Sequence, residues 1–125
     1  MNVTLDECFQ FGLGAFETIG IEQGIPILLD KHLKRLERAA DFLKLGSLSE
    51  RGITARKIEK YLEEQKTRTE VQKEFRNLEH CALKIMLTKE NMVYSLRANH
   101  YTPEKYEKGF FIDISAVKRN ETSPL

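Results

Sequence analysis

The sequence predicts an α+β domain in which a mostly antiparallel sheet carries helices packed on one face. Two segments alternate apolar and polar residues with the period of two that marks strands, at residues 16–23 and 83–96. Between them, residues 30–46 repeat apolar positions every three or four residues, the period of an amphipathic helix. Both strand segments contain turn signals that indicate hairpins, and hairpins make antiparallel sheets.

Chain length and composition allow a single domain and exclude several functional classes. The 125 residues are 41% apolar, enough for one core and too few for two full-sized domains. A net charge of +1 provides no strong field for nucleic acid or anionic lipid. No apolar run reaches the roughly 18 residues of a membrane span, and residues 1–7 lack the features of a secretory signal. We therefore expect a cytoplasmic protein that binds neither nucleic acid nor membrane.

The two cysteines, Cys8 and Cys81, lie far apart and without metal-ligand spacing. This pattern fits a reduced protein better than a disulfide framework, and it predicts no metal site. Free cysteine behaves as a small apolar residue, so we expect both thiols to be buried.

The first predicted hairpin joins strands at residues 16–23 and 25–28. Its turn is Gln23-Gly24, and glycine is typical of such short connections. The two sides of the first strand differ in character: Thr18 and Gly20 lie on one side, and Glu17, Ile19 and Ile21 lie on the other.

The first predicted helix begins with Asp30 as its N-cap and ends near Gly46. A second helix is expected to start at Thr54 and to fade into the charged segment 65–76, and a further helical face is expected from residue 71 onwards. The apolar positions on which these predictions depend are Leu33, Leu36, Ala40 and Leu43 in the first helix, Ile58, Tyr61 and Leu62 in the second, and Val71, Phe75 and Leu78 in the third.

The second predicted hairpin follows His80, and residues 89–91 form its linker. After it, residues 103–109 predict a turn or a one-turn helix. A final strand, buried on one face, is expected from the alternating residues Phe110, Ile112, Ile114 and Ala116.

Two glycines, Gly12 and Gly14, precede the first strand. A dinucleotide-binding fingerprint needs a third glycine and a helix directly afterwards, so this pattern does not predict a Rossmann fold. The glycines can instead allow a positive φ or close backbone packing at the entrance to the strand.

Arg35 lies beside the apolar stripe of the first helix, one position before Leu36. A boundary arginine can bury its stem and extend its head to water, or it can present a planar fork of donors to a phosphate or carboxylate. His32 lies one turn earlier and can support such an anion or cap the preceding loop. We favour the structural role for this histidine.

In their order and spacing, these segments resemble the fold-type IV family of pyridoxal-phosphate enzymes, which contains the class IV aminotransferases and aminodeoxychorismate lyases. The resemblance covers essentially the whole chain, including residues 118–125, which are similar to the family's segment before its Schiff-base lysine. The matching positions are Gly12, Gly14, Phe16, Glu17, Thr18, Gly24, Pro26, His32, Arg35 and Leu36.

The resemblance implies pyridoxal 5'-phosphate as cofactor, a small-molecule amino substrate and a homodimer. It implies that Arg35 binds the cofactor phosphate. Residues 1–125 would form the N-terminal domain, and the catalytic lysine would lie beyond Leu125 in a C-terminal domain that this sequence lacks. We therefore expect no catalytic residue in this chain, and no activity from the chain alone.

For the substrate, the resemblance implies two further residues. Phe16 matches an aromatic position that lines the family's pocket, although it can equally be a core residue of the sheet. Arg97 lies where some relatives recognise a substrate carboxylate across the dimer, although it can also be a cross-strand surface charge. The segment Arg97-Ala98-Asn99-His100 departs by one residue from the Arg-x-His arrangement of D-amino-acid aminotransferases.

Within the family, the start of the chain, the helix motif and the closing segment are most similar to the aminodeoxychorismate lyases. These enzymes eliminate pyruvate to form 4-aminobenzoate in folate synthesis. A branched-chain or D-amino-acid aminotransferase is the alternative activity. An alternative of another class is a free-standing binding or regulatory domain without a second lobe.

Overall fold

The computed structural model describes residues 3–6, 10, 12–67, 78–99 and 103–117. Four strands form one antiparallel sheet in the order β2-β1-β3-β4, which confirms the predicted α+β fold. None of the helices in these ranges is long and apolar enough to cross a membrane. The elements are β1 (Gly14–Glu22), β2 (Ile25–Pro26), α2 (Leu29–Phe42), α3 (Ala55–Lys66), β3 (His80–Thr88), β4 (Met92–Ala98) and α5 (Pro103–Lys108).

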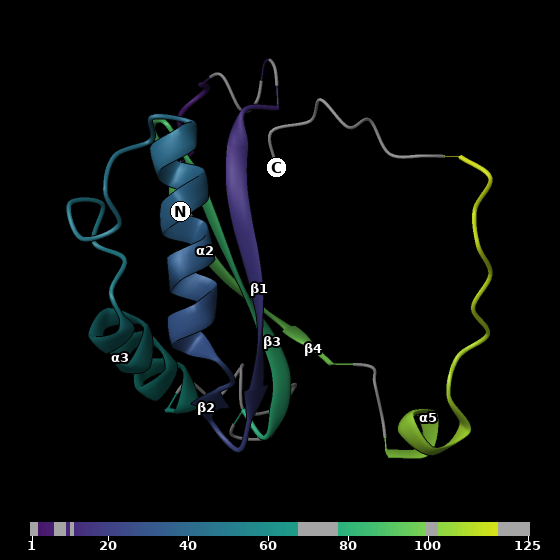
Figure 1. The fold of residues 1–125 in the computed structure, drawn as a ribbon. Coiled ribbons are helices and arrows are strands. Elements are labelled where there is room, and N and C mark those ends of the chain that lie inside the picture. Colours follow the sequence, from purple (N-terminus) through teal and green to yellow (C-terminus); the bar gives the residue numbers. More distant parts are fainter. Residues whose placement is uncertain (1–2, 7–9, 11, 68–77, 100–102, 118–125) are drawn as a thin grey trace.

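Helices α2 and α3 lie on one side of the sheet, as predicted (Figure 1). The odd-numbered residues of β1 and β3 face these helices, because successive side chains of a strand point to opposite faces. The even-numbered residues form the opposite, open face. The largest fully buried apolar side chains are Ile19, Ile21, Leu36, Ile53, Ile58, Leu62, Leu78, Leu83, Ile85 and Leu87.

The first hairpin is confirmed, but its second strand is shorter than predicted. Gln23 and Gly24 have φ values of 51° and 78°, so both central residues of the turn are left-handed, as in the tight turns that suit twisted strands. Strand β2 ends at Pro26, and Leu28 (φ 54°) turns the chain into α2. Most of β1 therefore has β3 as its neighbour on one edge and no strand among the described residues on the other.

The predicted N-cap of α2 is wrong. The helix begins at Leu29, and its N-cap is Leu28, which makes no side-chain capping hydrogen bond. The side chain of Leu29 is buried in the core, which favours a start one residue before Asp30, and Asp30 lies exposed in the first turn of the helix. The helix ends at Phe42 rather than near Gly46.

The predicted start of α3 is confirmed, because the Thr54 side chain accepts a hydrogen bond of 3.2 Å from the Lys57 backbone N–H. Tyr61 is partly buried, with its ring edge-on to Tyr94 at 5.1 Å between centroids. Of the expected third helical face, Val71 and Phe75 lie outside the described residues. Leu78 is buried in a turn at φ 62° and not in a helix.

The second hairpin is confirmed as β3 and β4, joined by residues 89–91. Its turn is tied to the N-terminal segment, which the sequence did not predict. The Asn91 side chain accepts from the Thr4 backbone N–H and donates to the Thr4 carbonyl, each at 2.7 Å. Asp6 accepts from the Thr88 hydroxyl and from the Glu90 backbone N–H. Residues 3–6 are thereby held at one end of the sheet.

The prediction that both cysteines are buried is confirmed for one of them. Cys81 is fully buried on β3 and makes no disulfide. Cys8 lies outside the described residues.

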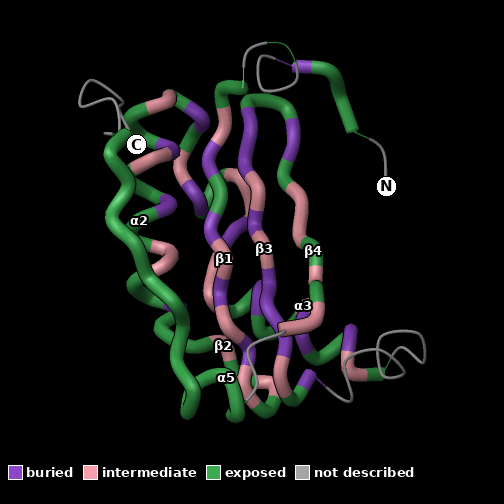
Figure 2. Tube along the Cα trace, turned by 90° about the vertical axis from the view of Figure 1, so that its right-hand side faces the viewer, coloured by how far each residue is buried: buried purple, intermediate pink, exposed green. Residues whose placement is uncertain are grey.

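The predicted final strand is wrong. Residues 110–117 pair with no strand among the described residues, and they lie away from the sheet on the side of its open face (Figure 1). All of them are exposed, as the continuous green of this segment in Figure 2 shows. An alternating pattern becomes a strand only when a sheet edge accepts its backbone hydrogen bonds. In the described part of the chain, this segment lies away from the open edges of β1 and β4 and makes no such pairs.

Candidate functional site

A buried carboxylate lies between the sheet and helix α2. Glu17 is on the face of β1 that the helices cover, in alternation with Ala15 and Ile19, and it is only 4% exposed. Burying an ionised carboxylate is costly unless other groups donate hydrogen bonds to it. The residues of α2 that face Glu17 therefore determine whether its carboxylate is ionised.

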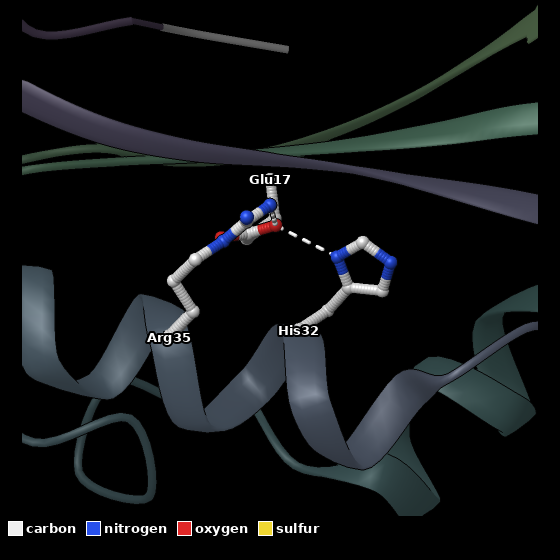
Figure 3. A network of polar contacts seen from close by, with 3 residues as sticks. All are labelled: Glu17, His32 and Arg35. Carbon is white, nitrogen blue, oxygen red and sulfur yellow. Dashed lines mark hydrogen bonds and ion pairs between the residues drawn. The ribbon is translucent and has the colours of Figure 1, made fainter.

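Two side chains of α2 converge on this carboxylate (Figure 3). His32 and Arg35 are three residues apart, so they lie on the same side of the helix. Arg35 Nε donates to Glu17 Oε1 at 2.5 Å, and Arg35 Nη2 donates to Glu17 Oε2 at 2.7 Å. His32 Nδ1 lies 2.7 Å from Oε2. The carboxylate thus has a two-pronged contact with the guanidinium and a third contact with the imidazole.

The hydrogen bonds of this cluster keep Glu17 ionised. Burial alone would raise its pKa, but the hydrogen bonds and positive charge of Arg35 and His32 outweigh burial and lower the pKa below its ordinary value of 4.5. The same pairing raises the pKa of Arg35. Both partners are therefore charged at neutral pH.

A cavity of about 600 Å³ lies next to this pair, between the N-terminal half of β1 and α2. Arg35 reaches it with a side chain that is 65% exposed, although Glu17 holds one edge of its guanidinium. An exposed guanidinium at the wall of a cavity can bind an oxyanion such as a phosphate or carboxylate. The lining residues include Phe16, Glu17, Arg35, Leu36, Arg38 and Phe42.

Phe16 also borders this cavity, but from the open face of the sheet. It is 62% exposed, which excludes the core position that the sequence left open. The ammonium of Lys84 lies 4.5 Å from the centre of the Phe16 ring, a cation–π contact between the neighbouring strands β3 and β1. The exposed ring is therefore available to line a binding site.

Arg97 is not brought to this cavity. The register pairs Gly20 with Ala82 and Ala82 with Arg97, which places Arg97 on the open face, opposite to Arg35. There it borders a separate hollow of about 420 Å³ together with Thr18, Asn99 and Lys105. The three predicted site residues are therefore divided between the two faces of one sheet.

Glu17 is the residue of this cluster to which sequence reasoning gave no role. A signal was present, because the alternation of β1 places Glu17 on the same side as Ile19 and Ile21. A carboxylate on a buried strand face requires cationic or hydrogen-bonding partners. His32 and Arg35, one turn apart on the next helix, were available as those partners.

Comparisons with known proteins identify relatives of the chain. It is 48% identical over 40 residues to the aminodeoxychorismate lyase of Bacillus subtilis (strain 168), which covers 32% of this chain and 14% of that protein. A crystal structure described as a candidate 4-amino-4-deoxychorismate lyase has the same fold, with a TM-score of 0.56 and 22% identity. That match covers 84% of this chain and 39% of the other. The aligned region is thus well under half of either relative.

The match to a family as a whole is more extensive than either pairwise match. The sequence profile of the family described as amino-transferase class IV matches residues 14–124, which include β1, Glu17, His32, Arg35 and Arg97. This region is nearly the whole chain, and we conclude that the protein belongs to the amino-transferase class IV family.

Proposed function

We propose that this chain forms the phosphate-binding side of a pyridoxal-phosphate-dependent enzyme and that Arg35 binds the cofactor phosphate. The observation that carries this proposal is the exposed guanidinium of Arg35, held by Glu17 at the wall of a cavity of about 600 Å³. A phosphate ester carries nearly two negative charges and suits a planar guanidinium donor. The residues present therefore fit the phosphate end of this cofactor.

The cofactor would supply an electron sink for reactions of an amino substrate. The residues of this chain would bind and orient: Arg35 would hold the phosphate of the cofactor, and Phe16 would line the substrate pocket. We place the catalytic lysine in a C-terminal domain beyond Leu125, so the chain alone would be inactive.

Arg97 would bind a substrate carboxylate at a different place from the phosphate. Because it lies on the open face of the sheet, it would serve a site to which a second subunit contributes. This division supports a homodimeric enzyme, in which the two faces of the sheet border different parts of the assembly.

For the activity of the whole enzyme, we propose an aminodeoxychorismate lyase, which releases pyruvate and forms 4-aminobenzoate. The identity of 48% over 40 residues to a curated lyase supports this activity. A class IV aminotransferase is the second candidate, because the matched family is described by that activity.

The enzyme that contains this chain can be assayed for both activities. We expect pyruvate release from aminodeoxychorismate to exceed amino-group transfer from branched-chain or D-amino acids to 2-oxo acids. Amino-group transfer without pyruvate release would reject the lyase in favour of the aminotransferase. Failure of both reactions with cofactor present would favour a binding or regulatory domain.

The role of Arg35 has its own test, which uses Arg35→Ala in that enzyme. We expect the affinity for pyridoxal 5'-phosphate to fall by about tenfold to a hundredfold, the scale of lost charged hydrogen bonds. Arg38→Ala is the matched control, because Arg38 borders the same cavity but has no hydrogen bond to Glu17. Equal losses in the two variants would show that the cavity needs only positive charge.

A further inference from the structure

We infer that Glu17 is a positioning residue that holds the guanidinium of Arg35 in the orientation that binds an oxyanion. This inference rests on the proposed role of Arg35 in phosphate binding. Glu17 belongs to the stretch of β1 that pairs with β3 and is 4% exposed, so its own position is set by the sheet and the core. It would act on the anion only through Arg35.

The hydrogen-bond pattern determines which part of Arg35 remains available. A guanidinium has five N–H donors, and Glu17 takes one from Nε and one from Nη2. These two donors form one edge of the planar group. The other edge, formed by Nη1 and the second hydrogen of Nη2, makes no hydrogen bond to any described residue and can donate two hydrogen bonds to an oxyanion.

Orientation matters here because the Arg35 side chain is 65% exposed. An exposed arginine samples many rotamers, and fixing one of them on binding costs conformational entropy. The contact with Glu17 fixes the guanidinium before the anion arrives. The anion then meets a preformed pair of donors.

His32 supports the same arrangement from the other side of the carboxylate. Since ionised Glu17 can only accept hydrogen bonds, the Nδ1 atom of His32 must carry the hydrogen in their contact of 2.7 Å. Oε2 of Glu17 therefore receives donors from both His32 and Arg35, which restrains rotation of the carboxylate. The structural role that we favoured for His32 becomes a restraint on the residue that orients Arg35.

Positioning and simple electrostatics predict opposite effects when the charge of Glu17 is removed. The carboxylate cancels the positive charge of Arg35, so electrostatics alone predicts that Glu17→Gln binds an anion more tightly. Positioning predicts weaker binding of the anion. The amide nitrogen of glutamine cannot accept a hydrogen bond from the guanidinium, so the two-pronged contact with Arg35 is lost. The sign of the change in affinity therefore decides between them.

The experiment titrates the 125-residue chain with pyridoxine 5'-phosphate at millimolar concentrations and follows the arginine side chains by NMR. This probe has no aldehyde and cannot form an imine with the lysines of the chain; pyridoxine, which lacks the phosphate, is the control ligand. The matched control variant is Glu22→Gln. Glu22 is on the same strand and also contacts a histidine, with 2.7 Å to His80 Nδ1, but it has no hydrogen bond to Arg35.

We expect Glu17→Gln to weaken binding of the phosphate ester by about tenfold. This is the scale of the entropy cost when the Arg35 side chain must be ordered by the ligand and is not ordered beforehand. Glu22→Gln should bind like the wild type. Unchanged or tighter binding by a folded Glu17→Gln chain would overturn the positioning role. If Arg35→Ala also binds the phosphate ester like the wild type, the proposed phosphate role of Arg35 fails as well, so the two failures can be told apart.

A second measurement on the wild-type chain does not depend on the folding of any variant. The Arg35 Nε–H signal should be protected from exchange before and after the phosphate ester is added, while the Nη signals shift. Loss of the protected Nε–H signal upon binding would mean that Arg35 leaves Glu17 to meet the anion. That result would overturn the inference, because the bound orientation would not be the one that Glu17 holds.

Discussion

Glu17 illustrates how a residue that is unfavourable in isolation becomes stable in context. A carboxylate that is 4% exposed would be destabilising on a strand whose neighbours on the same face are apolar. The three contacts from His32 and Arg35 offset that cost and hold α2 against β1 at the same point. Truncating either partner would leave the carboxylate with fewer donors and loosen this contact.

The lowered pKa of Glu17 predicts a specific acid sensitivity. Because the folded-state pKa lies below the ordinary value of 4.5, the stabilisation is fully present above that value and is lost as the pH falls through the folded-state pKa. Glu17→Gln cannot titrate and lacks this contribution. Urea unfolding can be measured from about pH 7 to about pH 3. We expect the wild type to have the higher free energy of unfolding at pH 7, and this difference between wild type and variant should shrink as the pH falls. A difference that stays constant over this range would contradict the prediction.

Cys81 provides a second prediction at this scale. Burial, followed by the nearby charge of Glu22, raises the pKa of its thiol to about 11. Because only the thiolate is nucleophilic, Cys81 should resist thiol reagents at neutral pH while the protein is folded. The measurement uses a Cys8→Ser background and compares labelling in buffer and in denaturant. Rapid labelling of the folded chain would show that the thiol is more accessible than its position on β3 implies.

Sequence patterns located Arg35 but could not determine its surroundings. Helical periodicity placed it at the boundary of the apolar stripe, and its head is exposed, as such a boundary predicts. Its pairing with Glu17 joins residues 18 positions apart, across a turn whose geometry the sequence did not specify. Periodicity predicts the face of its helix or strand on which each residue lies. It does not predict the distance between a helix face and a sheet face.

At the scale of elements, the predictions succeeded where a pattern and a partner coincide. Strands β1, β3 and β4 have both an alternating pattern and a neighbour to pair with, and they formed as expected. Residues 110–117 have the pattern without a neighbour, and they form no strand. The start of α2 was misplaced for another reason, because burial of Leu29 competes with the capping signal of Asp30.

The turn between β1 and β2 allows a test of why it contains glycine. Gly24 has a φ of 78°, where an L-residue is strained, and an added Cβ would come within 2.5 Å of Lys66 at the end of α3. We expect Gly24→Ala to lower the free energy of unfolding by about 1 kcal/mol, mostly from backbone strain because the lysine can move. Gly20→Ala is the matched control, since Gly20 has open space and no positive φ. If thermal unfolding shows the same loss of stability in Gly24→Ala and Gly20→Ala, the turn is not strained.

At the scale of the whole molecule, the two faces of the sheet have different roles. One face packs on α2 and α3 and encloses the core together with Glu17, and the other carries Phe16 and Arg97 in the open. The alternation of the strands predicted this separation in outline. It could not predict that the proposed phosphate-binding and substrate-binding residues would be divided by it, because that depends on the pairing register of β3 and β4.

The exposed apolar segment after α5 predicts self-association of the chain. Phe111, Ile112 and Ile114 are 98%, 83% and 92% exposed, and contiguous apolar surface of this kind marks an interaction site. We expect sedimentation velocity to show an average mass that rises with concentration. The double variant Phe111→Ser with Ile114→Ser should shift this association to about tenfold higher concentration, because two large apolar side chains no longer leave water. Leu5→Ser, at an exposed apolar residue outside the segment, should associate like the wild type, and a wild-type chain that stays monomeric at high concentration would refute the prediction.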